Sequence, residues 1–325
     1  MPISSSSKTE SRHWKKLSIR PRRNRQRVGS KVEVAGGVEA GLRMASGGSD
    51  PRSTNQTLDN FFDTKDFRLD QAYLKWKPLD SMSLVGGKFD NPLWTPSDLL
   101  WDSDITPEGA AAKLAFGPFF ANMGFFVLDE HSGDSNDPFM VTFQPGAKFD
   151  VGMVDFKLAA TGYWFSDITK SPLEFSADTN TRKDDGSDTL LYEYNSVSVG
   201  AEVGVNLEGF VERVALFGEG IYNPDPDEDE YGWLGGLKFG SKKVDEFGKW
   251  EAKYSYRRLE KDAWLDTFPD SDFFGGATGV QGHEGIISFG LTRHFTLDID
   301  YYHVEEIEDS DQDQQLLQLD FVAKF

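Results

Sequence analysis

Residues 81–110 read SMSLVGGKFDNPLWTPSDLLWDSDITPEGA, and the prediction of the fold starts from this stretch. One strand-like run ends at Phe89 and another begins at Glu108. The connection between them contains the pairs Asn91-Pro92, Thr95-Pro96 and Thr106-Pro107. Each Pro biases the residue before it away from helix. The connection is too long for a plain hairpin turn, and its tryptophans and leucines need a surface to pack on. We therefore predict a long loop, residues 91–107, that folds against or into a β-barrel.

The rest of the chain reads as strands of about ten residues, which is the length that a tilted barrel strand needs. Helical periodicity nowhere extends beyond a turn or two. Short and long connections alternate between the strands, as the periplasmic turns and outer loops of a transmembrane barrel do. The fifteen predicted strands cover residues 25–34, 38–47, 66–77, 81–90, 108–117, 119–129, 139–149, 152–164, 194–206, 211–222, 231–241, 248–259, 284–293, 295–305 and 315–325.

The order of the connections predicts one more strand. The first connection is short and the last is long, so the first and last of these strands both run towards the periplasm. Bacterial single-chain barrels have an even number of strands. We therefore expect a sixteenth strand, which runs the other way, either within residues 11–20 or upstream of the chain.

Alternation along the strands places apolar side chains on one face and polar side chains on the other. In the last strand Leu317, Leu319 and Phe321 share a face, and Asp320 lies opposite. Aromatic residues recur near strand ends, as in the girdles of membrane barrels, and Phe325 closes the chain as outer-membrane barrels close. The predicted fold class is an all-β, transmembrane, antiparallel β-barrel of about 16 strands that spans residues 25–325.

Charge is unevenly distributed along the 325 residues, which carry a formal net charge of −20 and no Cys. Residues 1–31 hold ten Lys or Arg and one Glu, so the remainder carries −29 and repels nucleic acid. The first 24 residues are basic and lack the apolar core of a secretory signal. We expect residues 1–24 to be disordered or to reflect a misassigned start.

Three segments also resemble a known family: LRMASGGSDPRSTNQTLDNFF, FRLDQAYLKWKPLDSMSL and GGKFDNPLWTPSDLLWDSDITPEGAA. They are similar to an outer-membrane porin family that is distantly related to the phosphate-selective porins, and the resemblance runs from about Arg25 to Phe325. It implies an outer-membrane location among lipids, passive diffusion of small hydrophilic solutes or ions through a water-filled barrel, and a homotrimer. The phosphate-selective relatives further imply an anion path lined by Lys and Arg.

Charged side chains on the predicted lumen faces are the candidates for lining the pore. They are Lys157, Glu202, Arg213, Glu219, Glu251, Lys253, Arg257, Asp298, Asp300, Asp320 and Lys324. Acids slightly outnumber bases and no dense basic ladder is visible, so we predict a mild cation preference rather than phosphate selectivity.

The inward loop is the candidate constriction. Its predicted residues are Trp94, Asp98, Trp101, Asp102, Asp104 and Glu108. Two alternatives are that this loop caps a neighbouring subunit or that it covers the rim of the barrel.

The sequence predicts no catalytic, cofactor-binding or metal-ligating residues. It contains neither G-x-S-x-G nor H-E-x-x-H, and its five His are scattered. Acidic runs in the predicted outer loops read as solvated surface, with Ca²⁺ or Mg²⁺ bridging to anionic lipid headgroups as the alternative. Two other classes stay open: a soluble acidic β-sheet protein that binds carbohydrate, and an outer-membrane barrel enzyme such as a lipase or protease.

Overall fold

The computed structural model describes residues 18–19, 22–130, 136–309 and 312–325, and nearly all of its regular structure is β. Among the described residues, no helix is long and apolar enough to cross a membrane. The long strands are β3 (Arg27–Ala35), β4 (Val38–Ser46), β6 (Phe67–Leu79), β7 (Met82–Lys88), β8 (Glu108–Phe116), β9 (Phe119–Val127), β10 (Phe139–Val151), β11 (Val154–Ser166), β12 (Val197–Asn206), β13 (Arg213–Tyr222), β14 (Tyr231–Gly240), β15 (Trp250–Leu259), β16 (Val280–Gly290), β17 (Phe295–Glu306) and β18 (Asp313–Ala323).

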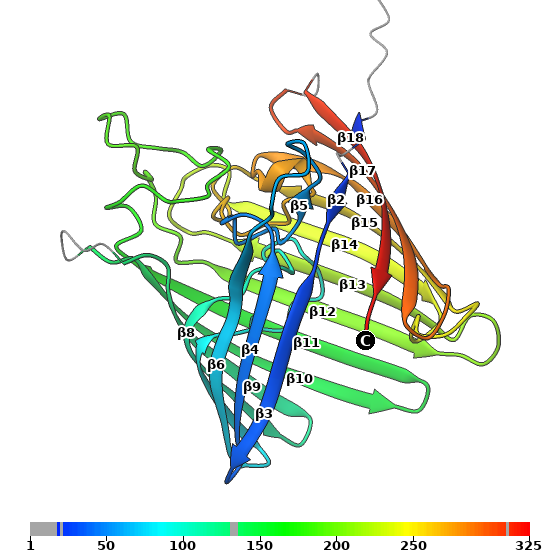
Figure 1. Ribbon diagram of the computed structural model, residues 1–325. Coiled ribbons are helices and arrows are strands. Elements are labelled where there is room, and N and C mark those ends of the chain that lie inside the picture. The colour runs from blue at the N-terminus through cyan, green and yellow to red at the C-terminus, as the bar shows by residue number, and fades with distance from the viewer. Residues whose placement is uncertain (1–17, 20–21, 131–135, 310–311) are drawn as a thin grey trace, which may run out of the picture.

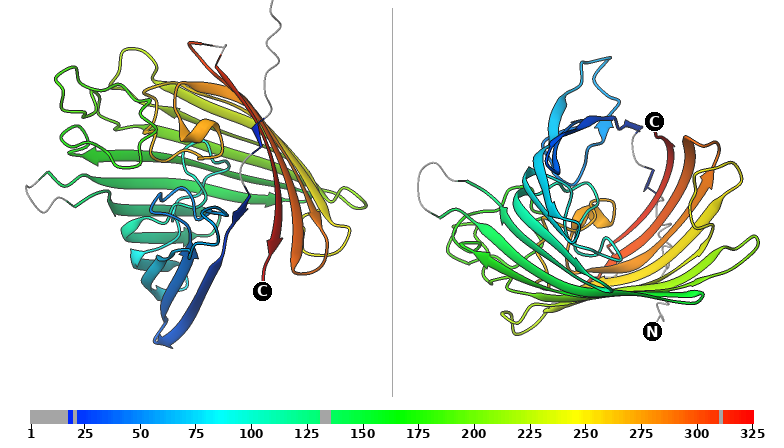
Figure 2. Two further views of the ribbon diagram at one scale, coloured as in Figure 1. Left: turned by 45° about the horizontal axis from the view of Figure 1, so that its top comes forward. Right: turned by 90° about the horizontal axis from the view of Figure 1, so that it is seen from below.

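These long strands confirm the predicted fold class. Each of the fifteen predicted ranges coincides with one of them, to within four residues at either end. Each strand pairs antiparallel with the next long strand in the chain, so the sheet is a continuous meander from β3 to β18. Figures 1 and 2 show this sheet curving around a central space, and the loop that carries the short 3-10 helix η1 (Phe274–Gly276) lies within that space.

The two edges of the meander, β3 and β18, are not paired with each other among the described residues. The short strand β1 (Ser18–Ile19) lies on β18 instead, and the two run parallel. Ser18 and Ile19 fall within residues 11–20, where the sequence predicted an antiparallel strand. For these two residues the predicted direction is wrong, and residues 11–17 and 20 lie outside the described residues. Part of the basic segment is also ordered, because β2 (Arg23–Asn24) pairs with β5 (Gln56–Thr57).

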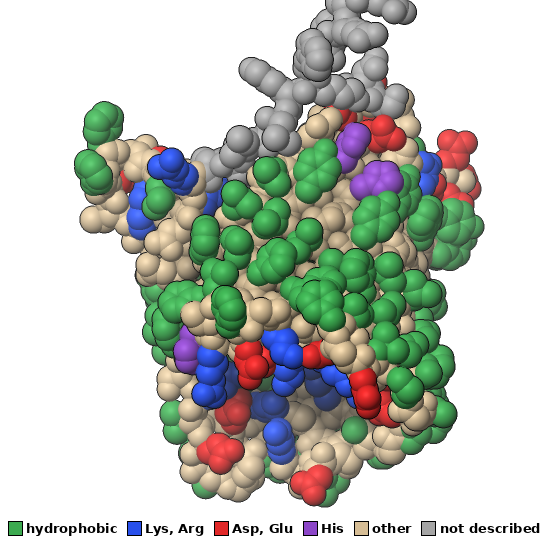
Figure 3. All heavy atoms as spheres, turned by 90° about the vertical axis from the view of Figure 1, so that its right-hand side faces the viewer, with side chains coloured by type: hydrophobic (Ala, Val, Ile, Leu, Met, Phe, Trp, Pro, Cys, Tyr) green, Lys and Arg blue, Asp and Glu red, His purple; other side chains and the backbone are tan. Residues whose placement is uncertain are grey.

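The outer face of the sheet is apolar. In β9, for example, Phe119, Met123 and Phe125 are exposed on the outside, whereas Asn122 and Phe126 are buried on the inside. The same alternation continues around the sheet, and Figure 3 shows hydrophobic side chains over the wall with charged side chains gathered in a hollow near one end. An apolar outer surface around a polar interior is the arrangement of a transmembrane barrel.

One end of the sheet carries the long connections and the other carries short turns; we call them the long-loop end and the short-turn end. At the long-loop end, residues 89–107, 167–196 and 260–279 pack inside the sheet and form a hydrophobic core with the inner faces of β9–β15. Leu99, Leu100 and Trp264 have no exposed surface. The prediction of a water-filled barrel is therefore wrong for this part of the interior, because three loops supply apolar partners that exclude water.

Candidate functional site

Most of the predicted pore-lining residues do lie on the inner face of the sheet. The strand registers place ten of them there: Lys157, Glu202, Arg213, Glu219, Glu251, Lys253, Arg257, Asp298, Asp300 and Asp320. Lys324 lies beyond the end of β18, where its backbone N–H donates to the carbonyl oxygen of His294 at 2.9 Å. Whether any of these side chains meets a passing solute stays a prediction.

The inward loop is anchored to the wall by a four-membered ion cluster. The Arg257 guanidinium of β15 donates to Asp98 of the loop at 2.5 Å and to Glu284 of β16 at 3.3 Å. Lys253, four residues earlier on the same face of β15, lies 3.7 Å from Asp98 and 3.3 Å from Glu284. The Ser255 hydroxyl also donates to Glu284, at 2.9 Å. Glu284 and Arg257 are each only 2% exposed, so this cluster fixes the loop position in a region from which water is largely excluded.

The electrostatics of the cluster favour the charged form of Asp98. Burial alone would raise the pKa of Asp98, but the nearby charges of Arg257 and Lys253 outweigh it and lower the pKa to about 2. Arg257 also stacks over the ring of Phe273, with 4.1 Å between the guanidinium carbon and the ring centroid. The sequence predicted Arg257 as a pore-lining residue; the structure instead buries it as the partner of Asp98.

Two further contacts hold the loop against the wall. The side-chain amide of Gln144 (β10) accepts from the backbone N–H of Trp94 at 2.7 Å and donates to its carbonyl at 2.9 Å. The Ser97 hydroxyl donates to Glu219 (β13) at 2.6 Å, so this predicted pore-lining carboxylate is also covered by the loop. Beneath the loop, β12 has Gly200, where an added Cβ would lie 2.9 Å from the Pro96 ring.

The middle of the loop belongs to the hydrophobic core rather than to an open path. The Trp101 ring stacks on Phe268 with centroids 4.7 Å apart and meets Trp264 edge to face at 6.2 Å. The Trp264 indole N–H donates to the Leu100 carbonyl at 2.8 Å. Trp101 is only 4% exposed. Its predicted constriction role is therefore wrong, because residues 260–279 fold over it.

Asp102 and Asp104 are likewise buried. Asp102 accepts backbone N–H groups from Ser271 and from Asp104, each at 2.9 Å. Burial raises the pKa of Asp102 to about 7 despite these donors. Asp104 accepts from Arg27 of β3 at 2.6 Å and from Arg25 at 3.3 Å. Both carboxylates thus hold segments of the chain together. The prediction that they line a constriction is wrong.

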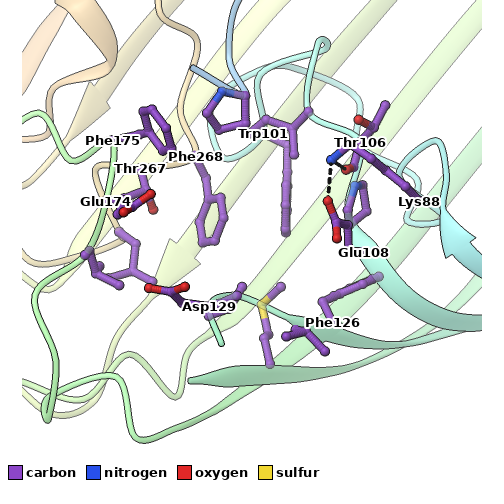
Figure 4. A pocket seen from close by; sticks show the side chains of 18 of the residues that line it. Lys88, Trp101, Thr106, Glu108, Phe126, Asp129, Glu174, Phe175, Thr267 and Phe268 are labelled. Carbon is purple, nitrogen blue, oxygen red and sulfur yellow. Dashed lines mark hydrogen bonds and ion pairs between the residues drawn. The ribbon is translucent and has the colours of Figure 1, made fainter. Parts of the chain in front are cut away.

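Glu108, the last predicted constriction residue, lies at the start of β8 and pairs with Lys88 at 3.0 Å. The pair lies at the side of a cavity of about 470 Å³ between the inward loops and the wall. Figure 4 shows Trp101 and Phe268 facing Phe126 across this cavity, with the pair at one side. Of the predicted loop residues, Trp94, Asp98 and Glu108 remain accessible.

A family model described as "Putative porin" matches residues 18–197 and 188–325, which together cover most of the chain. The chain belongs to this porin family. No curated protein matches the chain. The resemblance stated from the sequence is thereby confirmed.

Solved structures share the fold of this porin at low sequence identity. OprB of Pseudomonas putida, solved at low pH, has a TM-score of 0.50 and 12% identity, with 86% of this chain and 79% of that chain covered. Wzi of Escherichia coli, an outer-membrane carbohydrate-binding β-barrel involved in group 1 capsule assembly, has a TM-score of 0.53 and 11% identity, with 86% and 64% covered. A mutant porin of Rhodopseudomonas blastica has a TM-score of 0.49 and 8% identity, with 93% and 90% covered. These likenesses concern the fold alone.

The inner face of this porin carries two sectors of opposite charge. Asp298, Asp300 and Asp320 lie side by side on β17 and β18, because Asp298 is the register partner of Asp320 and Asp300 follows two residues later. Lys113 and Lys157 lie on β8 and β11, more than five strands away along the sheet. Between the sectors, on β12–β14, charges are paired: Glu202 binds Arg213 and Lys238, each at 2.9 Å.

Sequence reasoning missed part of the basic sector. Lys113 was inside a predicted strand but was not assigned to a face. The apolar alternation of Leu114 and Phe116 could have placed it inside, since neighbours in a strand point to opposite faces. Lys77 and Lys148 were missed for the same reason.

Two remaining predictions concern the chain end and metals. Phe325 follows β18, and its ring lies 5.9 Å from the His294 ring and 6.0 Å from the Phe295 ring, at the short-turn end. Across the ranges that the structure describes, no group of three or more His, Asp or Glu is placed to hold a metal ion. The proposed Ca²⁺ or Mg²⁺ bridging by the acidic loops stays a prediction.

Proposed function

We propose that the protein is an outer-membrane porin, without enzymatic activity, through which small hydrophilic solutes and ions diffuse down their gradients. The observation that carries the proposal is the opposition of an apolar outer face and a charged inner face around one curved sheet. In a bilayer, such a wall satisfies the backbone groups between its paired strands and presents apolar side chains to lipid.

The proposed path runs between the inward loops and the acidic sector. The ion cluster of Asp98, Arg257, Lys253 and Glu284 holds the loop on the wall formed by β15 and β16, so the loop narrows the interior from that side. Asp98 and Trp94 are the loop residues that a solute would meet. Because no Lys or Arg among the described residues lies within 4.0 Å of the carboxylate oxygens of Asp298, Asp300 or Asp320, these side chains favour cations in the path.

Two further features are proposed from the family. Outer-membrane porins function among lipids, and the exposed aromatic residues Trp76, Trp164 and Trp233, each about half exposed, suit the membrane interfaces. A homotrimer is the assembly that the porin resemblance implies. Chemical cross-linking of the protein in detergent tests the subunit number directly.

Planar lipid bilayers test the function. We expect step-like increases in current as purified protein inserts, and a gel mobility that changes on heating, because folded barrels migrate differently from unfolded ones. Protein that shows the heat-dependent shift and yet gives no current at any voltage overturns the open-pore proposal. Recovery of the protein in the supernatant after membranes are pelleted without detergent would favour the soluble alternative.

A further inference from the structure

A second cavity, of about 540 Å³, opens on the inner face near the short-turn end, directly beside Trp94 of the inward loop. Three lysines from three strands line it: Lys77 of β6, Lys113 of β8 and Lys157 of β11. Asp80, on the turn between β6 and β7, is the one carboxylate among the described lining residues. The cavity therefore carries a positive formal charge in a chain whose net charge is −20.

Two of these lysines have no carboxylate partner. Among the described residues, no carboxylate oxygen lies within 4.0 Å of the ammonium nitrogen of Lys113 or Lys157. Two other lysines on the inner face are paired: Lys238 lies 2.9 Å from Glu202, and Lys253 lies 3.3 Å from Glu284. Asp80 is the one carboxylate among the described lining residues, so three lysines leave the cavity with a net positive charge that is available to a ligand.

The rest of the cavity is apolar and aromatic. The ammonium group of Lys157 lies 4.6 Å from the centre of the Trp94 ring and 5.5 Å from that of Phe120. Pro92 and Leu93 also line the cavity, and its neutral polar residues are Ser81, Ser83 and Asn122. A ligand that fits both parts has an anionic group for the lysines and a flat apolar body for Trp94.

We propose that this cavity is a binding subsite for small organic carboxylates with a planar apolar body. Lys113 and Lys157 donate charge-assisted hydrogen bonds to the carboxylate, and Trp94 and Phe120 contact the apolar body. The subsite lies on the opposite side of the interior from Asp298, Asp300 and Asp320, so it is compatible with a preference for small cations along that wall. The inference rests on the proposed function for the route by which solutes arrive, but binding itself does not require conduction.

Isothermal titration calorimetry on the intact, detergent-solubilised protein tests the subsite, with benzoate as the probe. Loss of two hydrogen bonds from charged donors in the Lys113→Gln, Lys157→Gln double variant should weaken benzoate binding by about tenfold or more. The control is Lys88→Gln, which removes one positive charge from the long-loop end, where Lys88 pairs with Glu108. We expect the control to change benzoate affinity by less than about twofold. Heat-dependent gel mobility shows that each variant is folded.

Three further probes fix the ligand class. Benzyl alcohol has the ring without the charge, acetate has the charge without the ring, and inorganic phosphate has neither a ring nor a carboxylate. We expect each to bind more weakly than benzoate. Equal weakening by Lys88→Gln and by the double variant overturns the subsite, and phosphate binding tighter than benzoate overturns the ligand class. Benzoate binding by protein that carries no current overturns the proposed function and leaves the subsite standing; current with no benzoate binding does the reverse.

Discussion

The two halves of the inner face are built from the same strands and yet differ in chemistry. Along β15 the inward side chains run from Glu251 and Lys253 at the short-turn end to Leu259 at the long-loop end. Along β13 they run from Arg213 to Ile221 in the same sense. The charged half faces the interior space, whereas the apolar half is covered by the inward loops. Alternation thus decides which face a side chain occupies, and position along the strand decides whether that face is wet.

The junction between the two halves is where the largest effect is expected. Replacing Arg257 with Leu leaves Asp98 and Glu284 with Lys253 alone as a shared basic partner. Removing one member of a buried ion pair typically costs about 3–5 kcal/mol. We expect the loop to detach from β15, the temperature of the heat-dependent gel shift to fall, and the single-channel current to become larger and noisier.

The neighbouring Arg258 supplies the control for that experiment. It lies on the other face of β15 and pairs with Glu260 at 3.3 Å, with about a third of its side chain exposed. Such a pair contributes about 0–1 kcal/mol, so Arg258→Leu should leave both readouts close to those of the parent protein. Equal effects of the two substitutions would show that the ion cluster does not anchor the loop.

A substitution that leaves a cavity tests how much the apolar half of the interior contributes to stability. Leu100 has no exposed surface and packs within the loop core. Leu100→Ala should destabilise the folded state by about 2–5 kcal/mol, through lost burial and the void that remains. The measurement is again the temperature of the gel shift, with Leu58→Ala as the control, since Leu58 is 59% exposed. A change no larger than that of the control would mean that the loop core does not stabilise the barrel.

The stability of the folded state should depend on pH through Asp102, which lies in the apolar half of the interior. Its pKa is raised to about 7 in the folded state because it is buried. An unfolded Asp has a pKa of about 3.9. A raised folded pKa favours the protonated form, so this contribution to stability is fully present below about pH 4 and is lost as the pH rises through 7.

Asp102→Asn should remove that dependence. The backbone N–H groups of Asp104 and Ser271 bind different oxygens of Asp102, so the single amide oxygen of Asn can keep one of the two contacts. We expect the stability of the variant relative to the parent to rise between pH 4 and pH 8, by a few kcal/mol at most. The gel-shift temperature is measured for both proteins across this pH range. The difference between them removes the contributions of the other titrating groups, which the two proteins share. A constant difference at all pH values contradicts the assignment.

Substitutions in the charged half of the interior should have the smallest effect. Replacing Asp298 and Asp300 with Asn removes two carboxylates from the acidic sector, and charges a few ångströms from an ion in water contribute about 1 kcal/mol each. The reversal potential under a salt gradient should move towards the value expected for a channel without a preference for cations. Asp227→Asn with Glu228→Gln, on an exposed loop, is the control and should change it less. An unchanged reversal potential in the first variant would show that Asp298 and Asp300 lie off the path.

The strands and their faces could be predicted from the sequence because period-two alternation is local. The roles of Asp98, Asp102 and Trp101 could not, because their partners lie far along the chain. Arg257 is 159 residues from Asp98, and Trp264, which covers Trp101, lies in a connection that has no periodic pattern. The inner-face polarity gradient was present in the sequence of β13 and β15. It becomes meaningful only once the loops are known to fill one half. The sixteenth strand was inferred from parity, and parity does not determine how Ser18 and Ile19 pair.

Gly200 has a consequence for the bore of the channel. The loop lies so close to β12 that one methyl group at this position would contact the Pro96 ring at 2.9 Å. Alanine there would push Pro96 and Trp94 away from β12 and stretch the two hydrogen bonds between Trp94 and Gln144. The width of the proposed path thus depends on a recess one carbon atom deep in the backbone beneath the loop.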